Sequence, residues 1–262
     1  MENNISLSAF RDEPDMMFEF MDFFFHFKPR KYQEKFLRDC LLQKRIAGLW
    51  SRQSGKSTTI SIYCGFRMII SPTTIIISAP SQTQSSELYS KIRCLFEDNE
   101  ILRTLIKKSS ETEMVLKNGS RVKALPSGPE GKTILGFTAD IVIVEEAGRM
   151  KDEIVNRVLV PMIASKGNEG QIIKIGTPFK RNHFYSSCFN PDTQYSVTRV
   201  TWKDCVEEGQ YTQDYINEQR ANCVDVQFKS EYEAAFIEEL TSMFPISLVE
   251  SCVLDYKLVS VL

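Results

Sequence analysis

The clearest evidence for the fold comes from residues Ile46-Ala47-Gly48-Leu49-Trp50-Ser51-Arg52-Gln53-Ser54-Gly55-Lys56-Ser57, which continue into Thr58-Thr59-Ile60. The first five residues form an apolar run that predicts a buried strand, and the residues from Lys56 onward predict a helix. The loop between them fits the second half of the phosphate-binding pattern G-x-x-x-x-G-K-[ST], although Trp50 stands where the first glycine is expected. A Gly-Lys-Ser triplet alone is a weak signal, and a chance turn is the alternative. Its position between a strand and a helix indicates a nucleotide loop.

The predicted loop has the chemistry that phosphate groups require. Gly55 lets the backbone approach the phosphates, and the helix N-terminus directs N–H groups at them. Lys56 can reach the β and γ phosphates, and Ser57 can ligate Mg²⁺. The expected nucleotide contacts are Ser51, Arg52, Gln53, Ser54, Gly55, Lys56, Ser57 and Thr58.

Three further apolar runs resemble the first, at Thr73–Ala79, Ile141–Val144 and Ile172–Ile175. Strands that are apolar on both faces and are mostly separated by helical stretches predict a parallel sheet covered on both sides, hence an α/β fold. Met114–Leu116 and Arg121–Leu125 flank an Asn-Gly turn and predict an added β-hairpin. Ligands of such sheets bind at the carboxyl ends of the strands.

Two strand ends carry candidate catalytic groups. The run ending at Val144 is followed by Glu145 and Glu146, the Walker B arrangement, in which the first acid holds Mg²⁺ through water and the second polarises the attacking water. Glu145 replaces the usual Asp, and an acidic helix cap is the alternative interpretation. The next strand ends at Gly176-Thr177-Pro178, where Thr177 can sense the γ phosphate; a simple turn is the alternative.

Tyr32 and Gln33 precede the loop by about one helix. A Gln side chain can bond both the donor and the acceptor of an adenine edge, and Tyr32 or Phe27 can stack on the base. Without other signals, an ordinary amphipathic helix start explains the same residues.

Length and composition narrow the possibilities. The chain has 262 residues, of which 42% are hydrophobic and 25% charged, so it can bury a sizeable core. Lys and Arg number 32 against 34 Asp and Glu, and this net charge of −2 excludes a nucleic-acid binder that works by bulk basicity. Seven separated cysteines without a C-x-x-C pair favour reduced thiols in a cytosolic protein. No apolar run approaches the ~20 residues that cross a bilayer, so no membrane contact is expected.

The charge is distributed unevenly. Residues 28–56 hold nine bases and two acids, a sum of +7, whereas residues 1–27 sum to −5 and residues 204–262 to −9. Ordinary surface charge is one explanation, and a phosphate-facing segment between acidic elements is the other. We expect N-terminal helices in residues 1–45, an ATPase core in 46–205, and an acidic segment in 206–262. We expect the two acidic ends to pack together as a small helical annex.

Taken in order, these residues resemble the ATPase domain of the large terminase subunit, the DNA-packaging motor of tailed double-stranded DNA bacteriophages. The resemblance covers about residues 27–240. It rests on Tyr32-Gln33, the loop at 51–57, the strand before Glu146, Gly176-Thr177-Pro178 and Phe228–Phe236. The deviant first glycine and the Arg inside the loop are familiar in this family.

The resemblance implies a RecA-like P-loop NTPase fold of the ASCE type and Mg²⁺-dependent hydrolysis of ATP that moves double-stranded viral DNA. Lys56, Glu146, Arg52 and Thr177 would be catalytic, with Arg52 on phosphate as a switch between motor states, and Ser57 and Glu145 would hold Mg²⁺. Implied partners are double-stranded DNA, the procapsid portal protein, the small terminase subunit and further copies in a working ring, although the isolated chain can be a monomer. The implied location is the cytoplasm of the infected bacterial host.

Two departures from the family pattern matter. Leu135 occupies the place of an Arg that is proposed to act on a neighbouring subunit's ATP, and Lys132 and Arg149 are the candidate substitutes. The family's C-terminal nuclease would begin where this chain ends, so no nuclease activity is expected.

Two other hypotheses stay open. A superfamily 2-like helicase shares these motifs, but only about 85 residues follow Pro178, too few for a second lobe of the usual domain size. A nucleotide-binding assembly module with little turnover would explain Glu145 and Leu135.

Overall fold

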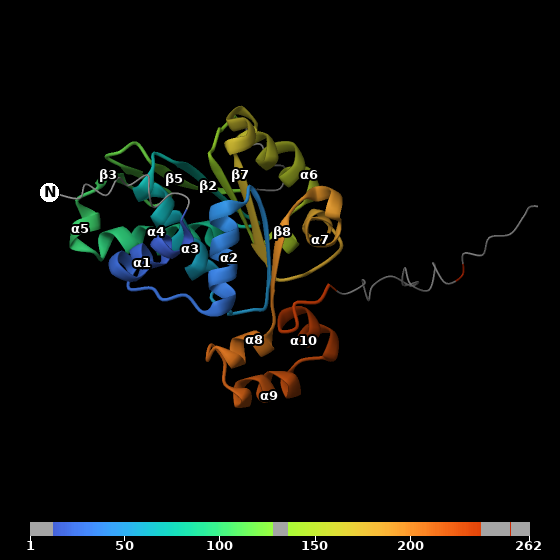
Figure 1. Ribbon diagram of the computed structural model, residues 1–262. Helices are drawn as coiled ribbons and strands as arrows, with labels where there is room; N and C mark the ends of the chain where they lie inside the picture. The colour runs from blue at the N-terminus through green and yellow to red at the C-terminus, as the bar shows by residue number, and fades with distance from the viewer. Residues whose placement is uncertain (1–12, 128–135, 237–251, 253–262) are drawn as a thin grey trace, which may run out of the picture.

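A computed structural model of the protein describes residues 13–127, 136–236 and residue 252. Eight strands form one sheet in the order β3-β4-β5-β2-β6-β7-β1-β8. Helices cover both faces of this sheet, and a group of three helices lies below its carboxyl edge (Figure 1). The α/β prediction is therefore confirmed. No helix among the described residues has the length and apolar character that crossing a membrane requires.

The central strands are parallel, as the apolar runs predict. β7 pairs in parallel with both β1 and β6, and β2 pairs in parallel with β6. The predicted hairpin is also confirmed, because β4 and β5 are antiparallel with Met114 opposite Val122. The strands are β1 (Arg45–Trp50), β2 (Thr74–Ala79), β3 (Ile106–Ser109), β4 (Glu113–Leu116), β5 (Arg121–Pro126), β6 (Ile141–Glu145), β7 (Gln171–Gly176) and β8 (Ser196–Val200).

Two strands escape the sequence prediction, and both lie at the edges of the sheet. β3 pairs only with β4, and β8 pairs in parallel with β1. Three of the four residues of β3 are exposed, and β8 is buried only at Thr198 and Val200. Edge strands with so few buried positions lack the apolar run by which the central strands are recognised.

The helices fall into three groups by position in the chain. The first contains α1 (Pro14–Phe25), α2 (Lys31–Leu42), α3 (Lys56–Ile70), α4 (Gln82–Glu97) and α5 (Glu100–Arg103). The second contains η3 (Ala147–Arg149), α6 (Asp152–Ile154), η4 (Val155–Leu159), η5 (Val160–Glu169), α7 (His183–Phe189) and η6 (Pro191–Thr193). The third contains α8 (Trp202–Glu207), α9 (Gln213–Asn222) and α10 (Asp225–Glu231). α1 and α2 are helices of the kind expected within residues 1–45.

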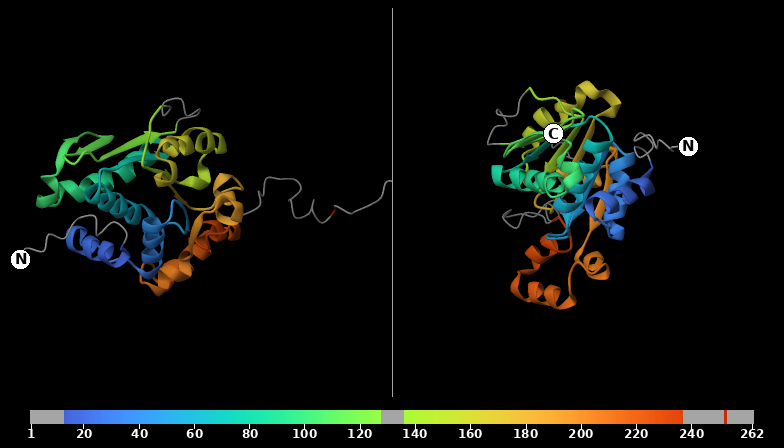
Figure 2. Two further views of the ribbon diagram at one scale, coloured as in Figure 1. Left: turned by 45° about the horizontal axis from the view of Figure 1, so that its top comes forward. Right: turned by 90° about the vertical axis from the view of Figure 1, so that its left-hand side faces the viewer.

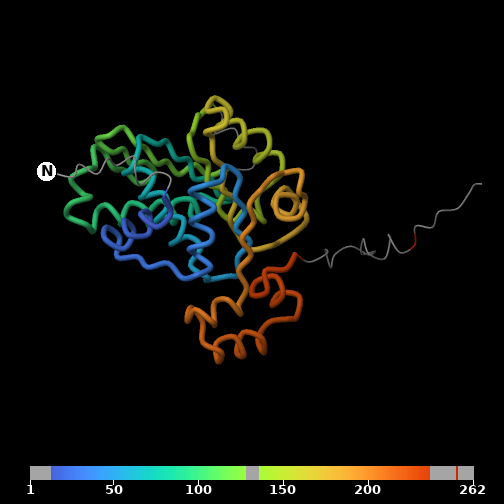
Figure 3. The backbone as a smooth tube through the Cα atoms, in the orientation of Figure 1, coloured from blue at the N-terminus to red at the C-terminus, as the bar shows by residue number. Residues whose placement is uncertain are grey.

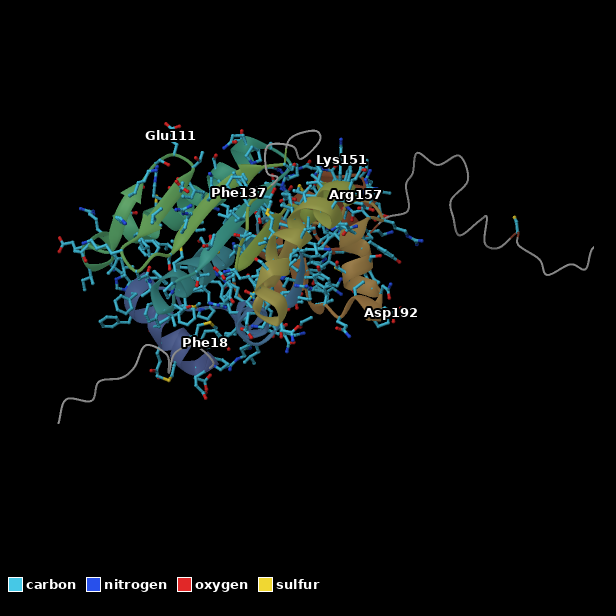
Figure 4. All side chains as sticks on the ribbon, turned by 90° about the horizontal axis from the view of Figure 1, so that it is seen from above. Phe18, Glu111, Phe137, Lys151, Arg157 and Asp192 are labelled. Atoms are coloured by element: carbon cyan, nitrogen blue, oxygen red, sulfur yellow. The ribbon has the colours of Figure 1, made fainter. Side chains whose placement is uncertain are left out.

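Neighbouring side chains along a central strand enter two different cores. Ile75 and Ile77 belong to the core with α1 to α4, whereas Ile76 belongs to the core with α6, η5 and α7. This alternation follows from the two-residue period of a strand. In Figure 4, Phe18 on α1 and Arg157 beside α6 mark these two sides. The sheet is therefore buried on both faces, which explains its continuous apolar runs.

The described residues of the two acidic ends lie in different places. α1 packs on α3, where the rings of Phe20 and Phe66 are 5.3 Å apart. α8 to α10 instead lie below the carboxyl edge of the sheet, away from α1 (Figures 2 and 3). An ion pair between Lys31 and Glu208 joins the start of α2 to the end of α8. The expected joint annex is thus not seen in these residues, and the domain boundaries stay a prediction.

Candidate functional site

A cavity of about 420 Å³ lies at the carboxyl edge of the sheet. The loop after β1, the ends of β6 and β7, and one side of α4 form its walls. Its lining includes Lys56, Ser57, Glu145, Glu146 and Thr177. Because β6, β7 and β1 are neighbours in the sheet, their carboxyl ends bring together residues that are far apart in the sequence.

The loop between β1 and α3 has a backbone suited to binding an anion. Gln53 and Gly55 have positive φ angles of 57° and 88°, so the chain turns sharply into α3 at Lys56. Glycine adopts this conformation without steric cost. The free N–H groups at the start of this 15-residue helix lie beside the cavity and favour negative charge there.

The side chain of Lys56 reaches across the phosphate-binding loop. Its Nζ donates to the carbonyl of Ser51 at 2.7 Å and lies 3.5 Å from Thr177 Oγ1. Burial lowers the pKa of Lys56, while Glu146 and Glu145 oppose this shift. The ammonium therefore lies between the phosphate loop and both strand ends, where a bound polyphosphate would need positive charge.

Ser57 and Glu145 form the candidate metal site. Ser57 Oγ donates to Glu145 Oε1 at 2.9 Å, and Glu145 Oε2 is buried with no hydrogen-bond partner among the described residues. Burial, reinforced by Glu146, raises the pKa of Glu145 to about 7, while Lys56 and Ser57 lower it. An orphaned carboxylate oxygen beside a hydroxyl fits Mg²⁺, which prefers oxygen ligands and is held by few protein groups.

Glu146 occupies a tightly held turn. Its φ of 51° is in the left-handed region, and its side chain lines the cavity. A Cβ on Gly176 would lie 2.8 Å from the backbone nitrogen of Ala147, so only glycine permits this close approach of β7. Asn182 Nδ2 also donates to the carbonyl of Gly148 at 3.0 Å. The segment around Thr177 thus braces the turn that presents Glu146.

Tyr32 and Gln33 lie behind the loop and do not line the cavity. Gln33 is 2% exposed, its Oε1 accepts from the backbone of Arg30, and its Nε2 donates to Thr59 at 3.1 Å. The hydroxyl of Tyr32 donates to the carbonyl of Ser54 at 3.1 Å. In this structure, the predicted adenine-binding residues support the loop from behind.

The other predicted residues of the phosphate loop differ in whether they reach the cavity. Ser51 and Ser54 are fully buried, and Ser54 Oγ donates to the carbonyl of Ser51 at 2.7 Å. Ser51 Oγ shares a hydrogen bond with the hydroxyl of Tyr211 at 3.2 Å. These serines therefore shape the loop, whereas Gln53 and Thr58 line the cavity.

Arg52 lines the cavity but is paired with the helical group below it. Its Nη1 lies 3.0 Å from Glu231 Oε2, and its backbone nitrogen donates to the carbonyl of Glu231 at 2.7 Å. The carboxylate of Glu231 raises the pKa of Arg52. Gln210 and Tyr215 hydrogen-bond to Gln53 at 3.0 and 3.1 Å. The predicted phosphate contact of Arg52 therefore competes with Glu231.

Sequence reasoning missed several residues of this site. Gln84, Glu87 and Lys91 on α4 line the cavity, as does Gln210. No motif marks them, because they reach the cavity through the position of α4 and of the turn between α8 and α9. Phe228–Phe236, which carries part of the resemblance, does contain Glu231.

The candidate trans-acting residues are only partly described. Lys132 and Leu135 lie outside the described residues. Arg149 is exposed, its guanidinium lies 4.6 Å from the centre of the Phe179 ring, and it does not line the cavity.

The phosphate-binding loop follows β1, the paired acids stand at the end of β6, and β7 lies between these two strands. This arrangement defines a RecA-like P-loop ATPase of the ASCE type. The family described as "Terminase large subunit, T4likevirus-type, N-terminal" matches residues 48–251. The chain therefore belongs to this terminase family.

Solved structures share the fold. The ATPase domain of the Thermus phage P74-26 large terminase is 20% identical, with a TM-score of 0.71 over 84% of this chain and 98% of that chain. The large terminase of bacteriophage HK97 is 15% identical, with a TM-score of 0.70 over 86% of this chain and 55% of that chain. A large terminase from a thermophilic bacteriophage, in complex with ADP, is 9% identical, with a TM-score of 0.58 over 80% of this chain and 54% of that chain. The chain thus spans about half the length of the HK97 large terminase and of the large terminase in complex with ADP. No curated protein sequence matches it.

Proposed function

We propose that this chain is the motor domain of a large terminase subunit, which hydrolyses ATP to move double-stranded viral DNA into a procapsid. One observation carries the proposal: Lys56, Glu145, Glu146 and Thr177 line a single cavity beside a phosphate-binding loop. Family membership supports it, and so does the fold shared with terminases crystallised with ADP and with ATP-gamma-S.

Nucleotide binding would use the loop and its lysine. The N–H groups at the start of α3 receive the phosphates, and Lys56 exchanges its contact with the carbonyl of Ser51 for phosphate oxygens. Ser57 and Glu145 would hold Mg²⁺. When bound, Mg²⁺ neutralises charge that develops on the phosphate oxygens.

Hydrolysis would depend on Glu146 as the group that orients and polarises the attacking water. The braced turn holds its carboxylate at the cavity, on the side of β6 and β7. Thr177 lies within 3.5 Å of Lys56 Nζ, so its hydroxyl can report whether a γ phosphate is present.

The helical group α8 to α10 below the sheet would respond to the presence or loss of the γ phosphate. On α10, Glu231 pairs with Arg52 of the phosphate loop, and Ser230 Oγ donates to the carbonyl of Pro178 at 2.7 Å. α10 therefore contacts both the loop and the segment after Thr177. A shift of either one would be transmitted to α8 to α10.

The partners follow from the proposed motor role. They are double-stranded DNA, the procapsid portal protein, the small terminase subunit and further copies of this chain in a ring, all in the cytoplasm of the infected bacterial host. DNA binding would use local clusters of Lys and Arg and would weaken with salt, because the net charge of −2 gives no general attraction.

A steady-state ATPase assay tests the proposal, with the wild type compared to Glu146→Ala at varied Mg²⁺, with and without double-stranded DNA. We expect Mg²⁺-dependent turnover that DNA stimulates and that falls by about 10²–10⁴-fold in Glu146→Ala. Glu153→Ala is the control, because Glu153 is exposed and does not line the cavity. Nucleotide binding without turnover above the variant would support the assembly module instead, and duplex unwinding by this chain alone would support the helicase.

A further inference from the structure

A second cavity, of about 580 Å³, lies on the other side of the sheet from α3 and α4. It is enclosed by the segments that run from α6 to η4 and from α7 to η6, together with β7. In Figure 4, Lys151 precedes this region and Asp192 follows α7 at its far end. It shares no lining residue with the nucleotide cavity. Its charged and aromatic lining consists of Asp152, Lys174, Arg181, His183, Tyr185 and Tyr195.

Lys174 is an unusual residue for the centre of a buried strand. It is 3% exposed and belongs to the same face of β7 as the core residue Ile172. Its Nζ donates to Ser187 Oγ at 2.8 Å and lies 4.7 Å from the centre of the Tyr195 ring. No described carboxylate forms an ion pair with it. An ammonium has three N–H donors, so one hydroxyl and one ring face leave its charge without a counter-ion.

Burial lowers the pKa of Lys174 to about 8, and the charge of Asp152 opposes this shift without forming an ion pair with Lys174. Asp152 is the single acid among the described residues that line the cavity, and its Oδ1 accepts from the backbone nitrogen of His183 at 2.8 Å. Burial lowers the pKa of His183 to about 4, so its ring is neutral at pH 7. Arg181 also lines the cavity, with its guanidinium 5.1 Å from the Tyr185 ring. Lys174 is therefore a buried cation at the lining without an ion-pair partner among the described residues.

We propose that this cavity is a second anion-binding site, which takes the phosphate or carboxylate group of a small molecule with Lys174 as its charge partner. Burying an unpaired charge is costly, and an oxyanion would accept the free N–H groups of the ammonium. Asn156, with a side-chain amide, and Ser186, with a hydroxyl, also line the cavity and can donate to further oxygens. The site is independent of the proposed ATP hydrolysis and goes beyond it.

Isothermal titration calorimetry of the full chain tests the proposal, in a buffer free of phosphate and carboxylates. Inorganic phosphate and succinate are titrated separately into the wild type and into Lys56→Met, which removes the lysine of the nucleotide loop. We expect at least one anion to bind both proteins with a Kd of about 1 mM or lower. Binding by phosphate alone or by succinate alone identifies the group that the site prefers.

Three variants in the Lys56→Met background locate the site. Lys174→Met keeps the length of the side chain but removes its charge, and we expect it to weaken binding at least about tenfold. Ser186→Trp fills the cavity without changing Lys174, and it decides the question if Lys174→Met does not fold. Lys180→Met is the matched control, because Lys180 is exposed and does not line the cavity, and its Kd should stay within about twofold. The absence of binding by either anion, or equal binding in all three variants, would overturn the proposal.

Discussion

The phosphate-binding loop is held in two different ways on its two sides. On the sheet side, Glu145 and Thr177 stand at the ends of buried parallel strands, and Lys56 begins α3 beside them. On the other side, Arg52 and Gln53 are held by polar contacts from α8 to α10, and the Arg52 side chain is 59% exposed. Buried packing resists displacement, whereas an exposed ion pair contributes little and is easily exchanged. The sheet side is therefore suited to fixed chemistry, and the helical side to movement.

The largest effect is expected on the sheet side. Lys56→Met should lower kcat for ATP hydrolysis by about 10²–10³-fold, because it removes a charge that is fixed in advance beside the phosphates. The measurement is steady-state phosphate release at saturating ATP. Lys180→Met should leave kcat within about twofold. A decrease below tenfold in Lys56→Met would contradict the assigned role of the sheet side.

The stability that buried groups give to the sheet can be tested through the pH dependence of the free energy of unfolding. Burial and the positive charge of Lys174 lower the pKa of His183 to about 4, although Asp152 opposes the shift. Between about pH 6.5 and pH 4, histidine in the unfolded chain binds a proton more strongly than buried His183 does. The stability that neutral His183 contributes is therefore present above pH 6.5 and is lost as the pH falls toward 4. From pH 7 to pH 4, the wild type should lose about 1–3 kcal/mol more free energy of unfolding than His183→Asn.

Urea unfolding at a series of pH values measures that difference. The chain has two histidines, and His26 is the matched control because it is exposed. His26→Asn should follow the wild-type pH profile. If the profiles of His183→Asn and the wild type were parallel, His183 would not be a neutral buried support of this side.

Glu145→Gln should raise the Mg²⁺ concentration for half-maximal ATPase activity by about tenfold, because an amide oxygen is a weaker Mg²⁺ ligand than a carboxylate. The measurement is a Mg²⁺ titration at fixed ATP. Glu87→Gln is the control, since Glu87 also lines the cavity but belongs to α4. Equal shifts in both variants would show a general effect of charge instead of a metal ligand.

The smallest effect is expected on the helical side. Glu231→Gln breaks the ion pair with Arg52 and should change the free energy of unfolding by less than about 1 kcal/mol. Because Arg52 is then released toward the phosphates, the KM for ATP should fall by up to about fivefold. Glu153→Gln breaks the exposed pair with Arg157 and should leave KM unchanged. A large loss of stability in Glu231→Gln would remove the contrast between the two sides.

Much of the sheet could be predicted from the sequence, because the four central strands are buried on both faces and are therefore mostly apolar. The hairpin was marked by its Asn-Gly turn. β3 and β8 could not be predicted, since edge strands bury few residues. The joint annex of the acidic ends is not seen in the described residues and stays a prediction; Phe20 packs on Phe66 of α3, and net charge does not specify a packing partner.

Short local patterns specify the available chemistry: a Gly-Lys-Ser loop, paired acids after one strand and a threonine after another, each recognised from its immediate neighbours. How these groups meet depends on folding, because Lys56 and Thr177 are 121 residues apart and Arg52 and Glu231 are 179 apart. The side chain of Gln33 also lies in the interior, where its amide donates a hydrogen bond to Thr59 behind the loop. A local pattern specifies the type and position of a residue. The direction of a long polar side chain depends on partners that only folding brings near.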